Sequence, residues 1–406
     1  MLQQAPLAAG LVAPLVIGGS AHAQLPDGPG KAVVERSCLG CHDATRITAS
    51  GYNVADWKNV VAMMRNAGAP LAPAQVDLVT SYLARHFPEK PRPKPKIILG
   101  RVHVTFHEWV VPTPGSRPHD PLATPDGAIW YTGHMANVLG RLDPKTGAIR
   151  EFHPDIPNSG PHGLVADSRG NIWFTGNFAG YIGKFDPRTG TFRDYHLPDP
   201  EAHDPHTPLF DRNGILWFTV QSADLIGRLD PKTGVIKLVR VPTPRANPYG
   251  MAFNSKGVLY FDLFGTNKLA SIDTATMRIT EYVLPHTESR PRRIAIMPDD
   301  TVWYSDYARG YLGRFDPATG KFTEWPSPGG PHSRPYGMTV LKGAIWYSES
   351  GTRPNTLVRF DPKTETFETW PIPSGGGVVR NMMATPDGNI AMAESGVNRV
   401  ALVEVR

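Results

Sequence analysis

Short runs of apolar residues, separated by Gly, Pro and Asp turns, recur along residues 97–406. One unit has four such runs, at residues 161–166, 170–175, 181–186 and 191–197, with an Asp-Pro-Arg-Thr-Gly turn before the last. The units repeat every 43 or 44 residues, opening at Pro118, Pro161, Pro205, Pro248, Pro291 and Pro335, with Val379 at the seventh position. Four short strands in about 43 residues are typical of a propeller blade. We therefore predict a mainly β protein, a seven-bladed β-propeller of four-stranded blades.

The two ends of this repeat region complement each other. The seventh unit ends at Arg406 after its third run, and residues 105–109 match the fourth run of other units, residues 321–325 and 366–370. We expect residues 105–109 to form the outer strand of the last blade. Such pairing would close the ring and leave no open sheet edge.

The residues before the propeller have a helical period instead. Trp57, Val60, Val61 and Met64 are spaced as one face of a helix, and shorter helical patterns cover residues 30–37 and 74–87. The pattern predicts a small all-α domain over residues 24–88. Alternating prolines and basic residues then predict an extended linker over residues 89–96, before the propeller at residues 97–406.

The first 23 residues are typical of a signal peptide. An apolar stretch over residues 7–19 precedes Ala21-His22-Ala23, an A-x-A cleavage pattern. The apolar stretch is too short for a membrane span. We expect cleavage near Ala23, a mature chain that is periplasmic or secreted, and no integral membrane segment.

Composition narrows the function classes. The chain has 42 Lys and Arg against 37 Asp and Glu, a net charge of +5 that is too small over 406 residues to predict nucleic-acid binding. Its apolar content excludes wholesale disorder. Two cysteines cannot form a disulfide framework. No Gly-rich nucleotide loop lies in a βαβ context, so the sequence does not predict NAD or FAD.

The two cysteines carry the clearest chemical signal. Cys38, Cys41 and His42 form C-x-x-C-H, the attachment pattern of a c-type haem. Two thiols on one turn can bond the haem vinyl groups, and the adjacent imidazole can reach the iron. A thioredoxin-like dithiol or a lone disulfide is the alternative, but the βαβ context of a thioredoxin motif is missing here. We predict one covalent haem c with His42 as its proximal ligand.

Met64 is the predicted sixth ligand of the haem iron, because it lies on the apolar helix face. Met63 is the next candidate, and an open or His-ligated position is the third alternative. Residues 28–88 are similar to short single-haem cytochromes c, through C-x-x-C-H, the helix from Trp57 to Met64 and the closing Tyr82-Leu83-Ala84 helix. With both axial positions filled, such a haem favours electron transfer.

The propeller repeats resemble the virginiamycin B lyase (streptogramin lyase) family. The shared elements are Pro-His/Tyr-Gly at blade starts, Gly-x-Ile-Trp-Phe/Tyr-Thr/Ser in second strands and Ile/Leu-Gly-Arg/Lys-Phe/Leu-Asp in third strands. The resemblance implies carbon–oxygen bond cleavage by elimination, with two histidines at Pro-His positions of consecutive late blades and glutamates near Mg²⁺. Here Tyr336 and Arg380 stand at those late positions, so the family's catalytic residues do not transfer one for one.

Innermost strands line the channel of a propeller, and two rings of residues are expected there. The first ring follows the blade-opening proline and comprises His119, His162, His206, Tyr249, Arg292, Tyr336 and Arg380. The second ring lies at the end of the second strand and comprises Gly133, Gly176, Val220, Leu263, Asp306, Glu349 and Glu394, with His134 beside it. Imidazoles on one side and Arg, Tyr and carboxylates on the other predict a ligand or active site at the channel mouth. A merely water-filled channel is the alternative.

We assign roles to these residues as follows. His162 and His206 are the predicted working residues, as general bases or metal ligands, with His119 and His134 beside them. Arg292 and Arg380 would hold an anionic or oxygen-rich part of a substrate. Glu349 and Glu394 would orient them or act as acid partners. Three histidines on adjacent blades are also compatible with a bound transition metal, or Mg²⁺ as in the resembled family.

Two function classes follow. In the first, the protein is an oxidoreductase whose propeller transforms a small molecule while the haem passes electrons to a periplasmic partner. In the second, the propeller is a non-redox lyase or a binding module, and the cytochrome is a separate unit on the same chain. Neither class involves nucleic acid.

Overall fold

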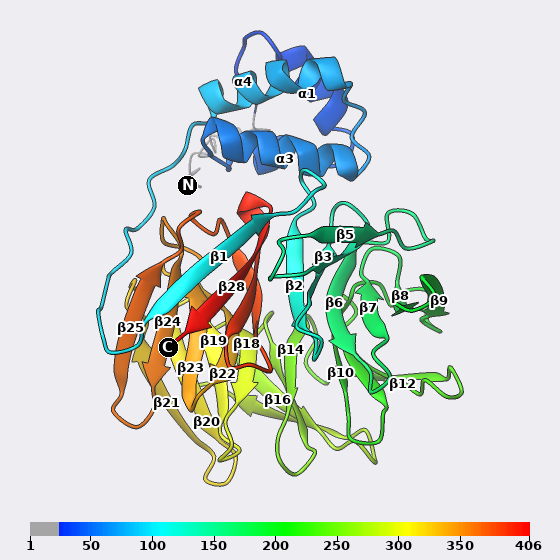
Figure 1. Cartoon of the computed structure of the whole chain (residues 1–406), viewed down its shortest axis with the longest axis vertical. Helices are drawn as coiled ribbons and strands as arrows, with labels where there is room; N and C mark the ends of the chain where they lie inside the picture. Colours follow the sequence, from blue (N-terminus) through cyan, green and yellow to red (C-terminus); the bar gives the residue numbers. More distant parts are fainter. Residues whose placement is uncertain (1–23) are drawn as a thin grey trace, which may run out of the picture.

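The computed structural model describes residues 24–406, so the predicted signal peptide lies outside the described residues. Seven antiparallel four-stranded sheets surround a central channel, and a small group of helices covers one end of this ring (Figure 1). The predicted mainly β, seven-bladed architecture is confirmed. Within residues 24–406, no helix is long and apolar enough to cross a membrane.

Each blade takes its strands in chain order from the channel outward. The first blade comprises β2 (Pro118–Ala123), β3 (Ile129–Gly133), β4 (Val138–Leu142) and β5 (Ile149–Phe152), and the second comprises β6 (Pro161–Ala166), β7 (Ile172–Gly176), β8 (Tyr181–Asp186) and β9 (Thr191–His196). The third comprises β10 (Pro205–Phe210), β11 (Leu216–Val220), β12 (Leu225–Leu229) and β13 (Ile236–Arg240), and the fourth comprises β14 (Pro248–Phe253), β15 (Leu259–Leu263), β16 (Lys268–Ile272) and β17 (Ile279–Val283). The next two are β18 (Pro291–Ile296), β19 (Val302–Asp306), β20 (Tyr311–Asp316) and β21 (Lys321–Pro326); and β22 (Pro335–Leu341), β23 (Ala344–Glu349), β24 (Thr356–Asp361) and β25 (Thr366–Pro371).

The seventh blade joins the two ends of the propeller. Its strands are β26 (Val379–Ala384), β27 (Ile390–Glu394) and β28 (Arg399–Val405), and β1 (Val104–Val110) supplies the fourth. β1 pairs antiparallel with β28 along its whole length, from Val104 opposite Val405 to Val110 opposite Arg399. The ring is therefore closed by the strand that precedes the first repeat, as predicted.

The repeated glycine of the third strand has a packing reason. A Cβ atom added at Gly183 would lie 2.2 Å from the ring of Phe174 on the neighbouring strand. Gly227 and Phe218 have the same relation in the next blade, at 2.1 Å. The aromatic residue of the second strand thus fills the space over the glycine, and the blade cores are built from such fully buried rings.

The residues before the propeller form their own helical core. The helices are α1 (Lys31–Cys38), α2 (Thr45–Thr48), α3 (Val54–Asn66), η1 (Pro73–Gln75) and α4 (Val76–His86). Trp57 and Val61 of α3 pack against Val79 and Leu83 of α4. The Trp57 indole also donates a hydrogen bond to the Phe87 carbonyl at 2.8 Å, which ties α3 to the end of α4.

Helix α3 lies on the end of the propeller (Figure 1). The Asn59 side chain donates to the Gly396 carbonyl at 2.8 Å, and Asn66 donates to the Pro114 carbonyl at 2.9 Å. Asp56 forms a 2.8 Å ion pair with Arg353 of the sixth blade. These contacts join the helical part to the loops around the channel.

The segment between the helices and β1 follows the outer edge of the sixth blade. Ile98 exchanges two hydrogen bonds with Thr369 of β25, at 2.7 Å and 2.9 Å, and the Arg101 amide donates to Glu368 at 2.8 Å. Residues 96–101 therefore cover an exposed sheet edge as well as linking two cores.

Deleting residues 24–95 should leave a folded propeller, because β1 and the contacts of residues 96–101 remain. Deleting residues 24–111 should destroy cooperative thermal unfolding, because the seventh blade loses β1 and exposes the edge of β28. Circular dichroism melts of both truncations measure this difference. Equal melting temperatures would show that β1 does not close the ring.

Candidate functional site

Every innermost strand begins with a break in its pairing. In the first blade Pro118 lies opposite Gly133 and Pro121 lies opposite Tyr131, with a register shift between them, and the other six blades have the same irregularity. A bulge of this kind turns consecutive side chains to one side of a strand. His119 and Asp120 are accordingly both buried in the channel and contact each other.

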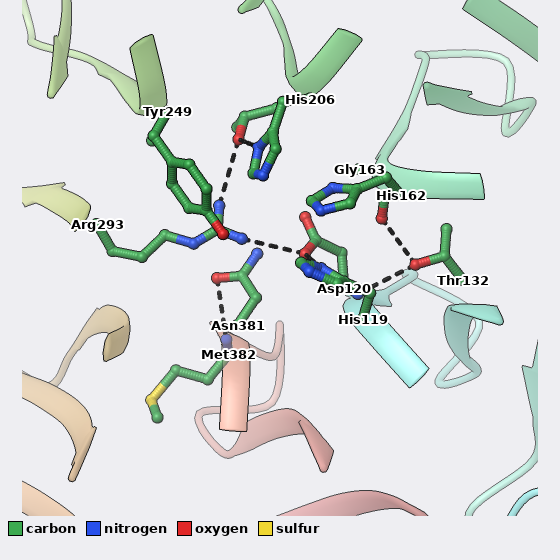
Figure 2. Close-up of polar contacts among 12 residues, drawn as sticks. His119, Asp120, Thr132, His162, Gly163, His206, Tyr249, Arg293, Asn381 and Met382 are labelled. Carbon is green, nitrogen blue, oxygen red and sulfur yellow. Dashed lines mark hydrogen bonds and ion pairs between the residues drawn. The ribbon is translucent and has the colours of Figure 1, made fainter. Parts of the chain in front are cut away.

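Hydroxyl groups of the second strands hold these bulges in place. Thr132 Oγ1 accepts a hydrogen bond from the Asp120 amide at 3.1 Å and donates to the His162 carbonyl of the next blade at 2.7 Å (Figure 2). Thr175 repeats both contacts with Gly163 and His206, at 2.9 Å and 2.8 Å. The hydroxyls therefore couple His162 and His206 to the preceding blade.

Four imidazoles gather at the end of the channel nearest the helices. The ring centroid of His162 lies 3.6 Å from that of His119, 3.8 Å from that of His206 and 5.1 Å from that of His134. All four side chains are buried. The structure thus brings the four predicted histidines together around His162. Figure 2 shows three of them, His119, His162 and His206.

Asp120 and Arg293 form an ion pair beside the four histidines. Asp120 Oδ1 is 2.8 Å from His119 Nδ1 and 3.2 Å from Arg293 Nη2, so it contacts the fifth blade across the channel. Arg293 also donates to Thr207 Oγ1 at 3.3 Å. Figure 2 shows Asn381 reaching into the same space from the seventh blade. Polar groups of four blades therefore meet here.

Burial lowers the pKa of each of the four histidines well below the usual range, and neighbouring imidazoles and arginines lower it further, with Arg380 acting on all four. Neutral imidazoles result. The Nδ1 atoms of His134 and His162 are buried and have no hydrogen-bond partner in residues 24–406. Such atoms are free to accept a hydrogen bond or to bind a metal.

The first ring continues with aromatic and cationic side chains. The Arg292 guanidinium lies 4.0 Å from the ring centroid of Tyr336 and 4.5 Å from that of Phe264. Tyr249 and Tyr336 hydrogen-bond through their hydroxyls. Burial raises the pKa of Tyr336, but Arg292 and Arg380 outweigh it, so that the pKa falls below its usual value. Arg292 is thus held by cation–π contacts inside the ring.

Glu349 and Glu394 are held by loops that connect neighbouring blades. Glu349 accepts hydrogen bonds from the Ser327 hydroxyl and the Gly329 amide, both at 2.6 Å. Glu394 accepts from Ser374 at 2.9 Å, and burial followed by repulsion from Glu108 raises its pKa well above the usual range. The hydrogen bonds and ion pairs of both carboxylates in residues 24–406 include none with the four histidines.

Asp120 and Arg293 are the functional candidates that sequence reasoning missed. Each is the second residue after the blade-opening proline, a position that strict strand alternation turns away from the channel. The bulge changes this orientation. Charged residues at a position that is glycine in three other blades, Gly163, Gly250 and Gly337, were the available signal.

Metal donors are present in this group. One ligand atom each from His119, Asp120 and His162 lies within 4.8 Å of the others. Imidazole and carboxylate donors suit a transition metal better than Mg²⁺. The positive charge of Arg293 beside Asp120 opposes a cation at this point, and metal binding stays a prediction.

A second cavity lies inside the helical part. It has a volume of about 170 Å³, and Cys38, His42 and Met64 all line it together with apolar side chains that include Trp57 and Leu83. Cys41 is exposed beside it. His42 Nδ1 donates to the Asp43 carbonyl at 3.0 Å, which leaves Nε2 as the available ligand atom.

Met63 and Met64 point to different places. Met64 lines the cavity of the helical part, whereas Met63 lines a separate cavity of about 120 Å³ between α3 and the propeller. Arg117 and Arg380 lie on the propeller side of that cavity. The first-ring residue Arg380 is therefore close to α3.

Asp204 should make the stability of the fold depend on pH. Its carboxylate accepts a hydrogen bond from Asn177, and the Asn177 side-chain oxygen lies 3.4 Å from His134 Nε2. Burial raises the pKa of Asp204 to about 6. The folded state therefore favours the neutral acid, and this contribution is complete below about pH 4 and is lost as the pH rises through about 6. We expect Asp204→Asn to remove a decrease of about 2 kcal/mol in the free energy of unfolding between pH 4 and pH 7. Urea unfolding of both proteins at several pH values measures it, and identical pH profiles would contradict the assignment.

The comparisons with known proteins concern the propeller. The model of the virginiamycin B lyase family matches residues 96–341. A solved streptogramin B lyase is 28% identical, with a TM-score of 0.68 over 75% of this chain and 98% of that chain. A catalytically inactive virginiamycin B lyase from Staphylococcus aureus with quinupristin is 24% identical, with a TM-score of 0.67 over 74% and 99%.

Other likenesses are limited to the fold. Hydrazine synthase from Kuenenia stuttgartiensis is 15% identical, with a TM-score of 0.60 over 71% of this chain and 95% of that chain. No curated protein sequence matches the chain. The family match covers more than half of the residues, and its repeats are the blades described above. The chain belongs to the virginiamycin B lyase family.

Proposed function

We propose that this protein is an exported c-type haem protein, an oxidoreductase in which a cytochrome c-like helical domain serves a lyase-family propeller. The observation that carries the proposal is the cavity of the helical part. Cys38 and His42 of C-x-x-C-H and Met64 of α3 line one apolar cavity, although 22 residues separate His42 from Met64 in the sequence.

The residues around this cavity fit a haem. Cys38 and Cys41 would form the thioether bonds, His42 Nε2 would be the proximal ligand, and Met64 Sδ would be the sixth ligand. The Asp43 carbonyl orients the His42 ring for this role. A haem c held in this way would supply one-electron transfer at its iron.

The packing of α3 on the propeller supports a joint function of the two parts. One side of this helix carries Met64 into the haem cavity, and the other carries Met63 into the cavity beside Arg380. A single helix therefore separates the proposed haem site from the end of the channel. We infer that a small molecule binds at this end of the channel and exchanges electrons with the helical domain.

A periplasmic electron carrier would complete the reaction. The predicted signal peptide favours export to the periplasm, and the C-x-x-C-H motif fits an exported c-type haem protein. The cysteine nearest the surface, Cys41, is exposed, so one side of the proposed haem site is open to such a partner.

A lyase activity is the second candidate, and family membership together with 28% identity to a streptogramin B lyase favours it. A histidine would then remove a proton and an ester would open by elimination. Two observations count against it: Tyr336 and Arg380 stand where the family resemblance implies histidines, and the four imidazoles, at most 6% exposed, offer little surface to a large substrate.

Haem attachment is tested first. Cys38→Ala combined with Cys41→Ala should abolish covalent haem, seen as loss of haem staining on a denaturing gel after periplasmic expression. Persistent staining of the double variant would contradict the proposal. Asp43→Ala is the matched control. It keeps the His42 side chain and both cysteines, so it should give a stained band.

The axial ligand is tested by spectroscopy. Met64→Ala should remove the weak sulfur-to-iron absorption band of the oxidised protein, because Met64 lines the haem cavity. Met63→Ala should keep the band, because Met63 faces the propeller. The reverse result would assign the ligand to Met63, and absence of the band from the oxidised parent protein would leave methionine out of the site.

The oxidoreductase and lyase activities can be distinguished with one protein preparation. Quinupristin and a set of small redox-active anions are added separately to the oxidised full-length protein, and the haem absorbance and the masses of the products are measured. We expect reduction of the haem by a small molecule and no cleavage of quinupristin. His162→Ala and His206→Ala should each slow this reduction by about 10²-fold without changing haem content. Ester cleavage with an unchanged haem spectrum would support the lyase instead.

A further inference from the structure

The cavity between α3 and the propeller has an unusual concentration of positive charge. Four arginines line it, Arg92, Arg117, Arg353 and Arg380, against a single carboxylate, Asp56. Its other walls include Val60 and Met63 of α3. The cavity therefore lies between the proposed haem domain and the first ring of the channel.

Two of these arginines are without a counter-ion. Arg353 pairs with Asp56 at 2.8 Å and with Glu89 at 3.0 Å. In residues 24–406, by contrast, no carboxylate lies within 4.0 Å of the guanidinium of Arg117 or Arg380. The Nε atom of Arg380 is buried and has no hydrogen-bond partner there.

Repulsion between these two side chains is large. Arg380 is the main cause that lowers the pKa of Arg117 to about 9, and burial adds to the effect. Arg117 and Arg380 are half-buried, and charges partly removed from water without partners destabilise a fold. A bound anion between the two guanidiniums would remove the repulsion.

We propose that the cavity binds a small oxyanion or carboxylate through Arg117 and Arg380. Guanidinium groups bind such anions with two parallel hydrogen bonds each. A volume of about 120 Å³ suits a small anion and is too small for a ligand as large as a streptogramin.

The position of the cavity gives the anion a role. The anion would lie between α3, which carries Met64 on its opposite side, and the channel end, where the charges of Arg117 and Arg380 lower the pKa of His134. We assign it as the substrate of the channel-end site. This assignment of a substrate rests on the proposed oxidoreductase function, whereas anion binding itself requires only the two arginines.

The proposal is tested by calorimetric titration of the full-length haem protein with formate, nitrite and sulfate. Arg117→Gln and Arg380→Gln should each weaken the tightest of these affinities at least 10-fold, and Arg380→Lys should retain part of it because the charge remains. Arg228→Gln is the matched control, since Arg228 is half-buried over Trp217 in the third blade, away from the cavity. Unchanged affinity in both glutamine variants, or an equal loss in the control, would overturn the proposal.

Thermal melts check that the variants fold. Without added anion, Arg117→Gln should melt a few degrees above the parent, because it removes the repulsion from Arg380, and formate should stabilise the parent more than the variant. A lower melting temperature of Arg117→Gln together with full anion binding would contradict the proposed repulsion between Arg117 and Arg380.

The haem-free Cys38→Ala, Cys41→Ala protein separates this inference from the proposed function. Anion binding in that variant with normal affinity supports the arginine site whatever the helical domain carries. Binding only when haem is present, with a shift of the main haem absorption band on addition of the anion, would place the anion at the iron and overturn the site between α3 and the propeller.

Discussion

The hydroxyl groups of the second strands set the geometry on which the channel depends. Thr132, Thr175 and Thr219 each accept from an amide of their own blade and donate to a carbonyl of the next, at 2.7–3.1 Å. The bulges at the innermost strands leave these backbone groups without ladder partners, and buried backbone groups require partners. The hydroxyls satisfy them and simultaneously fix the distance between blades, so that the close approach of the imidazoles follows from a backbone requirement.

The fourth blade meets this requirement with a different residue. Asp262 stands where five other blades have threonine or serine and the seventh has Ala393, and its Oδ2 accepts from the Gly250 amide at 3.0 Å. Burial raises the pKa of Asp262 well above its usual range, although Arg293 opposes this. A neutral carboxylic acid can both donate and accept a hydrogen bond, as a hydroxyl group can. Asp262 therefore keeps the acceptor role of the hydroxyl toward Gly250, while its buried Oδ1 has no hydrogen-bond partner in residues 24–406, and it places an ionisable group beside the channel.

The sequence predicts the blades well because each is specified locally. Turn residues, strand lengths and the Gly–aromatic pair recur every 43 or 44 residues, and β1 matches the outer strands by its own pattern. The first-ring histidines were found for the same reason. Asp120 and Arg293 were missed because a bulge breaks strand alternation, and no composition signal reports a bulge. The contact of α3 with Gly396 and Pro114 joins residues far apart in the chain, so that the cavity beside Arg380 could not be predicted from either segment alone.

Charge decides between the ligands that the channel end can hold. Arg117, Arg292, Arg293 and Arg380 gather there, and the nearby carboxylates are Asp120, which Arg293 already pairs, and Asp262, whose raised pKa favours its neutral form. The four imidazoles are neutral and add no negative charge. The net potential is therefore positive in a region from which water is largely excluded, where electrostatic interactions are strong. A metal cation bound to His119, Asp120 and His162 would oppose this potential, whereas an anion would be attracted by it. The same arginines that disfavour a metal thus make the end of the channel beside α3 a place for a negatively charged molecule, within one helix of the cavity lined by Cys38, His42 and Met64.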